Sequence, residues 1–137
     1  MINDSKRVSR GGGNAVQEPS GELRAARLVA IKSDVLNNLR QTTLSIHGMA
    51  SRHGVSIRYL RALFAADGTT FAKFVLQRRL AAAHAMLSDM RFAERTIGAI
   101  AFEVGFGDLA DLNRAFRRRY GVKPLDVREK AHLKNGG

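Results

Sequence analysis

The sequence predicts an all-α protein built around a duplicated pair of short helices. Apolar residues recur at helical spacing over residues 22–40 and 71–88, which is typical of amphipathic helices. Runs that alternate apolar and polar residues, as half-buried strands do, are missing, and both prolines lie outside the predicted helix interiors. The third observation is an internal repeat, which restricts the possible folds more than the other two.

The repeat has two copies of about 20 residues. Residues 45–50 match residues 96–101 at an offset of 51, and the following helix matches at an offset of 52. The matching positions after these segments are Gly54 and Gly105, Leu60 and Leu112, Phe64 and Phe116, and Gly68 and Gly121. The pattern predicts one helix pair at about 45–66 and a second at about 96–120, joined by the helix over 71–88.

Each copy has the features of a helix-turn-helix. Glycine accepts the left-handed backbone of a sharp reversal, and we expect Gly54 and Gly105 to end the first helix of each pair. Serine, threonine and aspartate side chains accept hydrogen bonds from the free amides at a helix start. The expected caps are Ser45 and Thr96 for the first helices, and Ser56 and Asp108 for the second helices.

The second helix of each pair divides into an apolar face and a polar face. The expected inward residues are Leu60, Leu63 and Phe64 in the first copy and Leu112, Ala115 and Phe116 in the second. The expected outward residues are Arg58, Arg61, Ala62 and Ala65, and then Ala110, Asn113, Arg114 and Arg117. Both outward sets form a single helical stripe. Met49 and Ile100, on the preceding helices, are assigned to the core.

Arginine and asparagine in such a stripe favour contact with DNA bases. An arginine fork pairs with O6 and N7 of guanine, and an asparagine amide pairs with adenine. Arg118 and Arg119 lie to the side of the stripe, where phosphate contact is expected, although a solvated charge run is the alternative. The other predicted phosphate contacts are Arg52, Ser56, Lys123 and Arg128.

Charge and composition agree with a polyanionic partner. The 137 residues carry a formal net charge of +11, with 23 Lys and Arg against 12 Asp and Glu. This charge alone fits nucleic acid, an anionic membrane or an acidic protein. The absence of cysteine excludes disulfides, thiolate zinc sites and thiol nucleophiles, and it fits a reducing compartment. No cofactor is expected.

The ends of the chain carry few signals. Residues 1–21 contain few apolar groups and the run Gly11 to Gly13, so we expect a disordered tail or linker before a domain over 22–131. Residues 132–137 are expected to form a C-terminal tail. No apolar run approaches the roughly 20 residues that span a bilayer, and no signal peptide is evident. The expected location is the cytoplasm, at the nucleoid.

With these residues in view, the chain resembles the AraC/XylS family of bacterial transcription regulators over about residues 28–130. Its strongest part runs from Ile100 to Asp108 and from Asn113 to Pro124, which is similar to the family signature of the second helix-turn-helix. Arg79-Leu80, followed by Ala83 and Leu87, resembles the family's linker helix.

The resemblance implies two helical lobes that face successive major-groove segments of double-stranded DNA. It also implies promoter binding and activation through RNA polymerase. The base-contacting positions that it implies are Arg58, Arg61, Ala62, Leu109, Ala110, Asp111, Asn113 and Arg114. The chain departs from the family pattern at Ala110, where serine is frequent, at Asp111, where histidine or tyrosine is frequent, and at Leu112, where phenylalanine is common. Phosphates repel an acidic Asp111, but its carboxylate can accept from a cytosine amino group.

Several alternatives remain at this stage. Family members often carry an effector-binding or dimerisation domain, so the chain is either a stand-alone regulator or a fragment. Without a sensory domain it could antagonise a full-length relative. A basic helical protein could also coat DNA, or lie on a membrane through Lys73, Arg78 and Arg79. The sequence leaves the oligomeric state open.

An enzyme acting on DNA is the least supported alternative. Related repair proteins transfer alkyl groups to cysteine, which this chain lacks. The segment Gly105 to Gly107 lacks the strand that precedes a nucleotide-binding loop. The four histidines, His47, His53, His84 and His132, do not have metal-ligand spacing.

Overall fold

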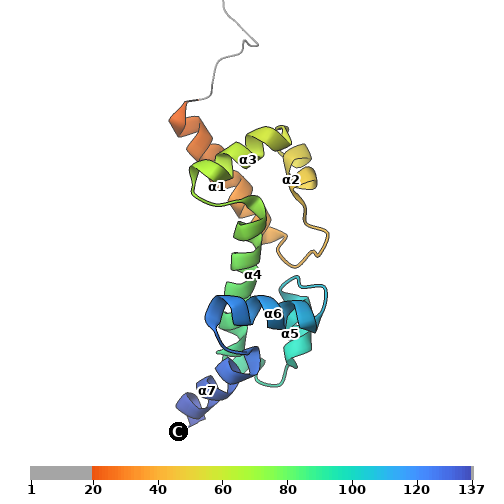
Figure 1. Ribbon diagram of the computed structural model, residues 1–137, viewed down its shortest axis with the longest axis vertical. Coiled ribbons are helices and arrows are strands. Elements are labelled where there is room, and N and C mark those ends of the chain that lie inside the picture. The colour runs from red at the N-terminus through yellow and green to blue at the C-terminus, as the bar shows by residue number, and fades with distance from the viewer. Residues whose placement is uncertain (1–19, 137) are drawn as a thin grey trace, which may run out of the picture. The chain divides into compact units, whose positions relative to one another are not determined.

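The computed structural model describes residues 20–136, and all regular structure in this part of the chain is helical, which confirms the all-α prediction. The described residues form seven α-helices and one short 3-10 helix, and Figure 1 shows how the α-helices follow one another. Their bounds are α1 Gly21–Asn37, α2 Ile46–Arg52, α3 Ile57–Ala66, α4 Phe71–Leu87, η2 Met90–Phe92, α5 Ile97–Glu103, α6 Leu109–Tyr120 and α7 Pro124–Gly136. The predicted disordered tail, apart from its last two residues, lies outside the described residues.

Two helix ends differ from the prediction. Helix α1 ends at Asn37 rather than near residue 40, and Asn38 Nδ2 donates to the carbonyl oxygen of Asp34 at 2.8 Å. Beyond this end of the helix, the carbonyl oxygens of Leu39 and Gln41 accept hydrogen bonds from Arg79 on α4. At the other end, α7 continues to Gly136, through most of the segment that was predicted to be a tail.

The predicted caps and turns of both helix pairs are confirmed. The hydroxyls of Ser45 and Thr96 accept from backbone amides at 3.1 and 3.0 Å, at the starts of α2 and α5. Ser56 caps α3 and Asp108 caps α6 in the same way, at 3.0 and 2.8 Å. Gly54 and Gly105 both have positive φ, +64° and +105°. Each pair is therefore a helix-turn-helix with locally encoded boundaries.

Buried aromatic and aliphatic side chains fix the first helix pair. Phe64 of α3 is fully buried. The centroid of its ring lies 5.7 Å from the ring centroid of Phe71 and 5.6 Å from that of Phe74, both on α4. Met49 of α2 is also buried, as predicted. The other buried apolar residues of this part are Ile31, Val35, Ala50, Leu60, Leu63 and Val75. The start of α4 thus belongs to the core of the first helix pair.

The second helix pair packs on the C-terminal half of α4. Helices α5, α6 and α7 all contact α4, and Figure 1 shows them gathered at that end of it. The shared core is formed by Leu80, Ala83, Leu87, Ile100, Ala101, Val104, Phe106, Leu112 and Phe116. Ile100 is fully buried, as predicted, and so is Leu112.

Arg79 joins the two helix pairs. Its Nε donates to the carbonyl oxygen of Leu39 at 3.0 Å, and its Nη2 donates to that of Gln41 at 2.7 Å. Burial lowers the pKa of the Arg79 guanidinium. Gly105, in the α5–α6 turn, packs against the same atoms: a β-carbon there would lie 2.2 Å from the Leu39 oxygen and 2.6 Å from Arg79 Nε. Arg40 Nη2 also lies 2.9 Å from Glu103 Oε2 of α5.

We predict that Gly105→Ala destabilises the protein by about 3 kcal/mol, since it combines left-handed strain with a backbone clash. Gly54→Ala is the matched control because Gly54 also has positive φ but a β-carbon there would meet no atom within 4 Å. The control should cost about 1 kcal/mol. Urea denaturation followed by circular dichroism measures both values, and equal losses would contradict the role assigned to Gly105.

Candidate nucleic-acid interface

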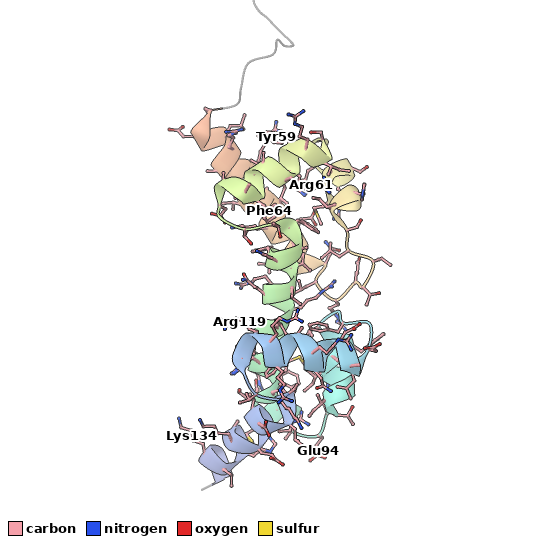
Figure 2. All side chains as sticks on the ribbon, viewed as in Figure 1. Tyr59, Arg61, Phe64, Glu94, Arg119 and Lys134 are labelled. Atoms are coloured by element: carbon pink, nitrogen blue, oxygen red, sulfur yellow. The ribbon has the colours of Figure 1, made fainter. Side chains whose placement is uncertain are left out.

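Helix α3 exposes one basic stripe and buries the opposite face. Leu60, Leu63 and Phe64 are buried. Arg58, Arg61, Ala62 and Ala65 are all exposed. Figure 2 labels Arg61 and Phe64, which come from this helix. The predicted division of α3 into two faces is therefore confirmed, and the exposed face that carries Arg58 and Arg61 is open to a partner.

Helix α6 repeats this arrangement. Leu112 and Phe116 are fully buried, and Ala115 is half-buried against the same core. The residues of the predicted outward stripe, Ala110, Asn113, Arg114 and Arg117, are all exposed. Leu109, at the first helical position, is 41% exposed and offers an apolar surface suited to a thymine methyl group.

The arginines of the two stripes differ in their local partners. Arg114 Nη2 donates to Asp111 Oδ1 one turn earlier in α6. By contrast, Arg58 and Arg61 of α3 form no ion pair with a carboxylate of residues 20–136. Within residues 20–136, α3 therefore presents guanidinium groups without an ion pair, whereas α6 presents a guanidinium held by a carboxylate.

The predicted phosphate contacts fall into two groups. Arg118, Arg119 and Lys123 are exposed, and Arg119 also stacks over the ring of Tyr120 at 4.8 Å. The Ser56 side chain is exposed at the start of α3 while it caps that helix. Arg52 is exposed as well, although its guanidinium already pairs with Asp34 at 2.8 Å. These five side chains remain available to a phosphate.

Arg128 has a partner within the protein. It was predicted to contact phosphate, but its side chain is half-buried and Nη2 donates to the carbonyl oxygen of Phe92 at 3.1 Å. Its Nε is buried as well. Arg128 therefore ties α7 to η2, and the charge that looked free in the sequence serves the fold. Nothing in the local sequence indicated this contact, which spans 36 positions.

Sequence reasoning also missed a network around Asp34. Its Oδ1 accepts from Arg52 and Asn38 at 2.8 and 2.9 Å, and its Oδ2 lies 2.8 Å from His53 Nε2. The network links the end of α1 to the turn between α2 and α3. Because the contacts cross 18 and 19 positions, no spacing in the sequence pointed to them.

The observed packing of α4 argues against adsorption to a membrane through this helix. Its apolar residues Phe71, Val75, Leu80 and Leu87 are buried in the protein cores. Across residues 20–136, no helix combines the length and the apolar character that are needed to cross a bilayer. Within the same residues, His, Cys, Asp and Glu side chains form no group of three or more that could hold a metal ion.

Comparison with known sequences follows this geometry. A family model described as a helix-turn-helix domain matches residues 49–130. The transcriptional activator RhrA of Rhizobium meliloti (strain 1021) is 41% identical over 106 residues, which cover 77% of this chain and 33% of RhrA. The regulatory protein SoxS of Salmonella typhimurium (strain LT2) is 32% identical over 88 residues, which cover 64% of this chain and 79% of SoxS. The chain thus spans about a third of RhrA.

Solved structures have the same fold. A transcriptional regulator with an AraC-type DNA-binding domain from Chromobacterium violaceum superposes with a TM-score of 0.71 and 25% identity, over 81% of this chain and 96% of that one. The DNA-binding domain of AdpA, solved in complex with a target DNA, superposes with a TM-score of 0.70 and 20% identity, over 79% of this chain and 95% of that one.

The capped helix pairs on either side of α4 define a tandem helix-turn-helix domain. The chain belongs to the AraC/XylS family of helix-turn-helix proteins, and the resemblance seen in the sequence is confirmed.

We predict that Arg128→Met lowers the free energy of unfolding by about 1–3 kcal/mol, because it removes the charged hydrogen bond from Arg128 to the Phe92 carbonyl oxygen, which keeps only the Arg95 amide as a donor. Arg118→Met is the matched control, since it removes the same charge from an exposed position and should change stability by less than about 0.5 kcal/mol. Thermal and urea denaturation measure both. The assignment of Arg128 to the fold is wrong if the two variants are equally stable.

Proposed function

We propose that this protein is a sequence-specific regulator of transcription that places α3 and α6 in successive major-groove segments of promoter DNA. The proposal rests on one observation above all: both helices bury an aromatic residue, Phe64 or Phe116, and expose a polar stripe that carries arginine on the opposite side. Family membership supports it, as do the names of the relatives, a transcriptional activator and a regulatory protein.

The proposed base contacts are those predicted from the sequence. On α3 they are Arg58, Arg61 and Ala62, and on α6 they are Ala110, Asp111, Asn113, Arg114 and Arg117. The proposed phosphate contacts are Arg52, Ser56, Arg118, Arg119 and Lys123, without Arg128. A chain bound to promoter DNA through these contacts would lie at the nucleoid in the cytoplasm. RNA polymerase, which binds the same promoter, is its second proposed partner. The domain has no catalytic role in this proposal.

Selection of bound fragments from genomic DNA with the purified chain tests the proposal. Two sequence boxes should emerge, with centres about one helical turn, or 34 Å, apart. Affinity for the selected site should exceed that for random DNA by at least about a thousandfold. Enrichment of no sequence would leave a non-specific basic protein, and a reporter under the selected site would distinguish activation from repression.

Arg61→Ala and Arg114→Ala should each weaken binding to the selected site by about 1–3 kcal/mol and relax the preference at one base pair, in different boxes. The reason is that a guanidinium fork satisfies O6 and N7 of guanine, and alanine cannot. Electrophoretic mobility shifts on sites with single base-pair changes measure the preference. An equal loss on selected and random DNA would show that these arginines do not contact bases.

Arg118→Ala should instead weaken binding to all sequences by a similar factor. Loss of one phosphate contact should reduce the slope of log K against log salt concentration by about one unit. Fluorescence anisotropy at four or five salt concentrations measures this slope. An altered base preference with an unchanged slope would contradict the assignment of Arg118 to phosphate.

A further inference from the structure

Helix α6 carries an ion pair on the surface that is proposed to face DNA. Arg114 Nη2 donates to Asp111 Oδ1 from one turn further along the helix. The two side chains remain 68% and 48% exposed, so both can reach a partner. An acidic residue in this stripe was expected to be repelled by phosphates, but its charge is compensated within the helix.

The backbone of Asp111 is held in place at the start of α6. Its backbone amide donates to Oδ1 of Asp108 at 2.8 Å, which fixes the first turn of α6. On the other side lies Gly107, where a β-carbon would be 3.7 Å from Asp111 Oδ2. Asp111 is therefore a carboxylate on a capped turn, and it restrains the longer and more flexible side chain of Arg114.

Helix α3 of the first pair has no ion pair in the described residues that corresponds to Asp111–Arg114. The offset of 52 residues between the second helices aligns Asp111 with Tyr59 and Arg114 with Ala62. The arginines of α3, Arg58 and Arg61, have no ion pair with a carboxylate in the described part of the chain. The two helices thus offer chemically different surfaces to DNA, although their backbones repeat.

Stability does not account for the Asp111–Arg114 pair. Ion pairs between exposed side chains contribute little to folding, because water and salt screen them and holding two side chains in place costs entropy. The same immobilisation favours binding, because the entropy of Arg114 is lost before DNA arrives. A guanidinium has five N–H donors in a rigid plane, so a bond to Asp111 leaves other donors for O6 and N7 of a guanine.

We propose that Asp111 is a positioning residue that orients Arg114 toward one guanine and makes the box contacted by α6 more stringent than the box contacted by α3. This inference rests on the proposed function and adds the determinant of specificity. The second carboxylate oxygen of Asp111, Oδ2, would accept a hydrogen bond from the amino group of a neighbouring cytosine or adenine. Replacement of Asp111 should therefore also change the preference at one or two adjacent base pairs.

The test measures dissociation constants of the full chain for all four base pairs at each position of both boxes in the selected site. Asp111→Asn should reduce the discrimination at the Arg114 position by about five- to tenfold, the scale of one side chain immobilised on binding. It should change affinity for the best site by less than about threefold, because the lost orientation is offset by one less negative charge near phosphates. Asp111→Glu should restore the preference.

Three controls separate positioning from other effects. Glu94→Gln removes the same charge from an exposed residue outside α6, labelled in Figure 2, and should leave every preference unchanged. At the base pair assigned to Arg114, the double variant Arg114→Ala with Asp111→Asn should show the same preference as Arg114→Ala alone. Circular dichroism should show that all variants are folded.

The outcomes are distinct. An Asp111→Asn protein with the wild-type base profile would overturn this inference while the proposed function stands, and so would a change confined to the α3 box. Failure of the wild-type chain to select any site would overturn the proposed function and this inference with it.

Discussion

The contact of Arg79 with the carbonyl oxygens of Leu39 and Gln41 is the interaction on which the arrangement of the domain depends. Each helix-turn-helix has its own caps, turn glycine and aromatic core, so each is encoded locally. Helix α4 contributes to both cores, and its Arg79 guanidinium, whose pKa is lowered by burial, contacts Gly105 of the second pair, which packs there without a side chain. Hydrogen bonds from a charged donor contribute more than those between neutral groups, so the two bonds of Arg79 stabilise this contact. The joint therefore favours a single arrangement of the two pairs.

Much of the fold follows from the sequence because the signals are local and occur twice. A serine, threonine or aspartate cap, an apolar stripe and a glycine at the turn act within a few residues, and the structure has them at Ser45, Gly54 and Ser56 and again in the second copy. The same reasoning assigned the exposed faces of α3 and α6 correctly. Their chemistry toward DNA stays a prediction, which the proposed variants test.

The contacts that sequence reasoning missed join residues far apart in the chain or depend on the direction in which a side chain points. Arg128 looked like one more surface cation, yet its donors meet the carbonyl oxygen of a residue 36 positions earlier. Arg79 and Gly105 were noted for their local patterns, and their shared contact with Leu39 became visible only in three dimensions. Asp111 was predicted as a base contact that phosphates could repel, and its ion pair with Arg114 was not foreseen from the sequence.

A binding series on DNA of altered spacing tests the central claim most directly, because a joint at Arg79 predicts that two helices contact two boxes at one fixed separation. In this series the two selected boxes are kept intact while one to five base pairs are inserted between them. Insertion of five base pairs turns one box to the opposite side of the duplex, and affinity should fall to about that of a site with one intact box. Affinity that stays within about threefold across the series would contradict the account, since it would mean that the two helix pairs bind DNA independently.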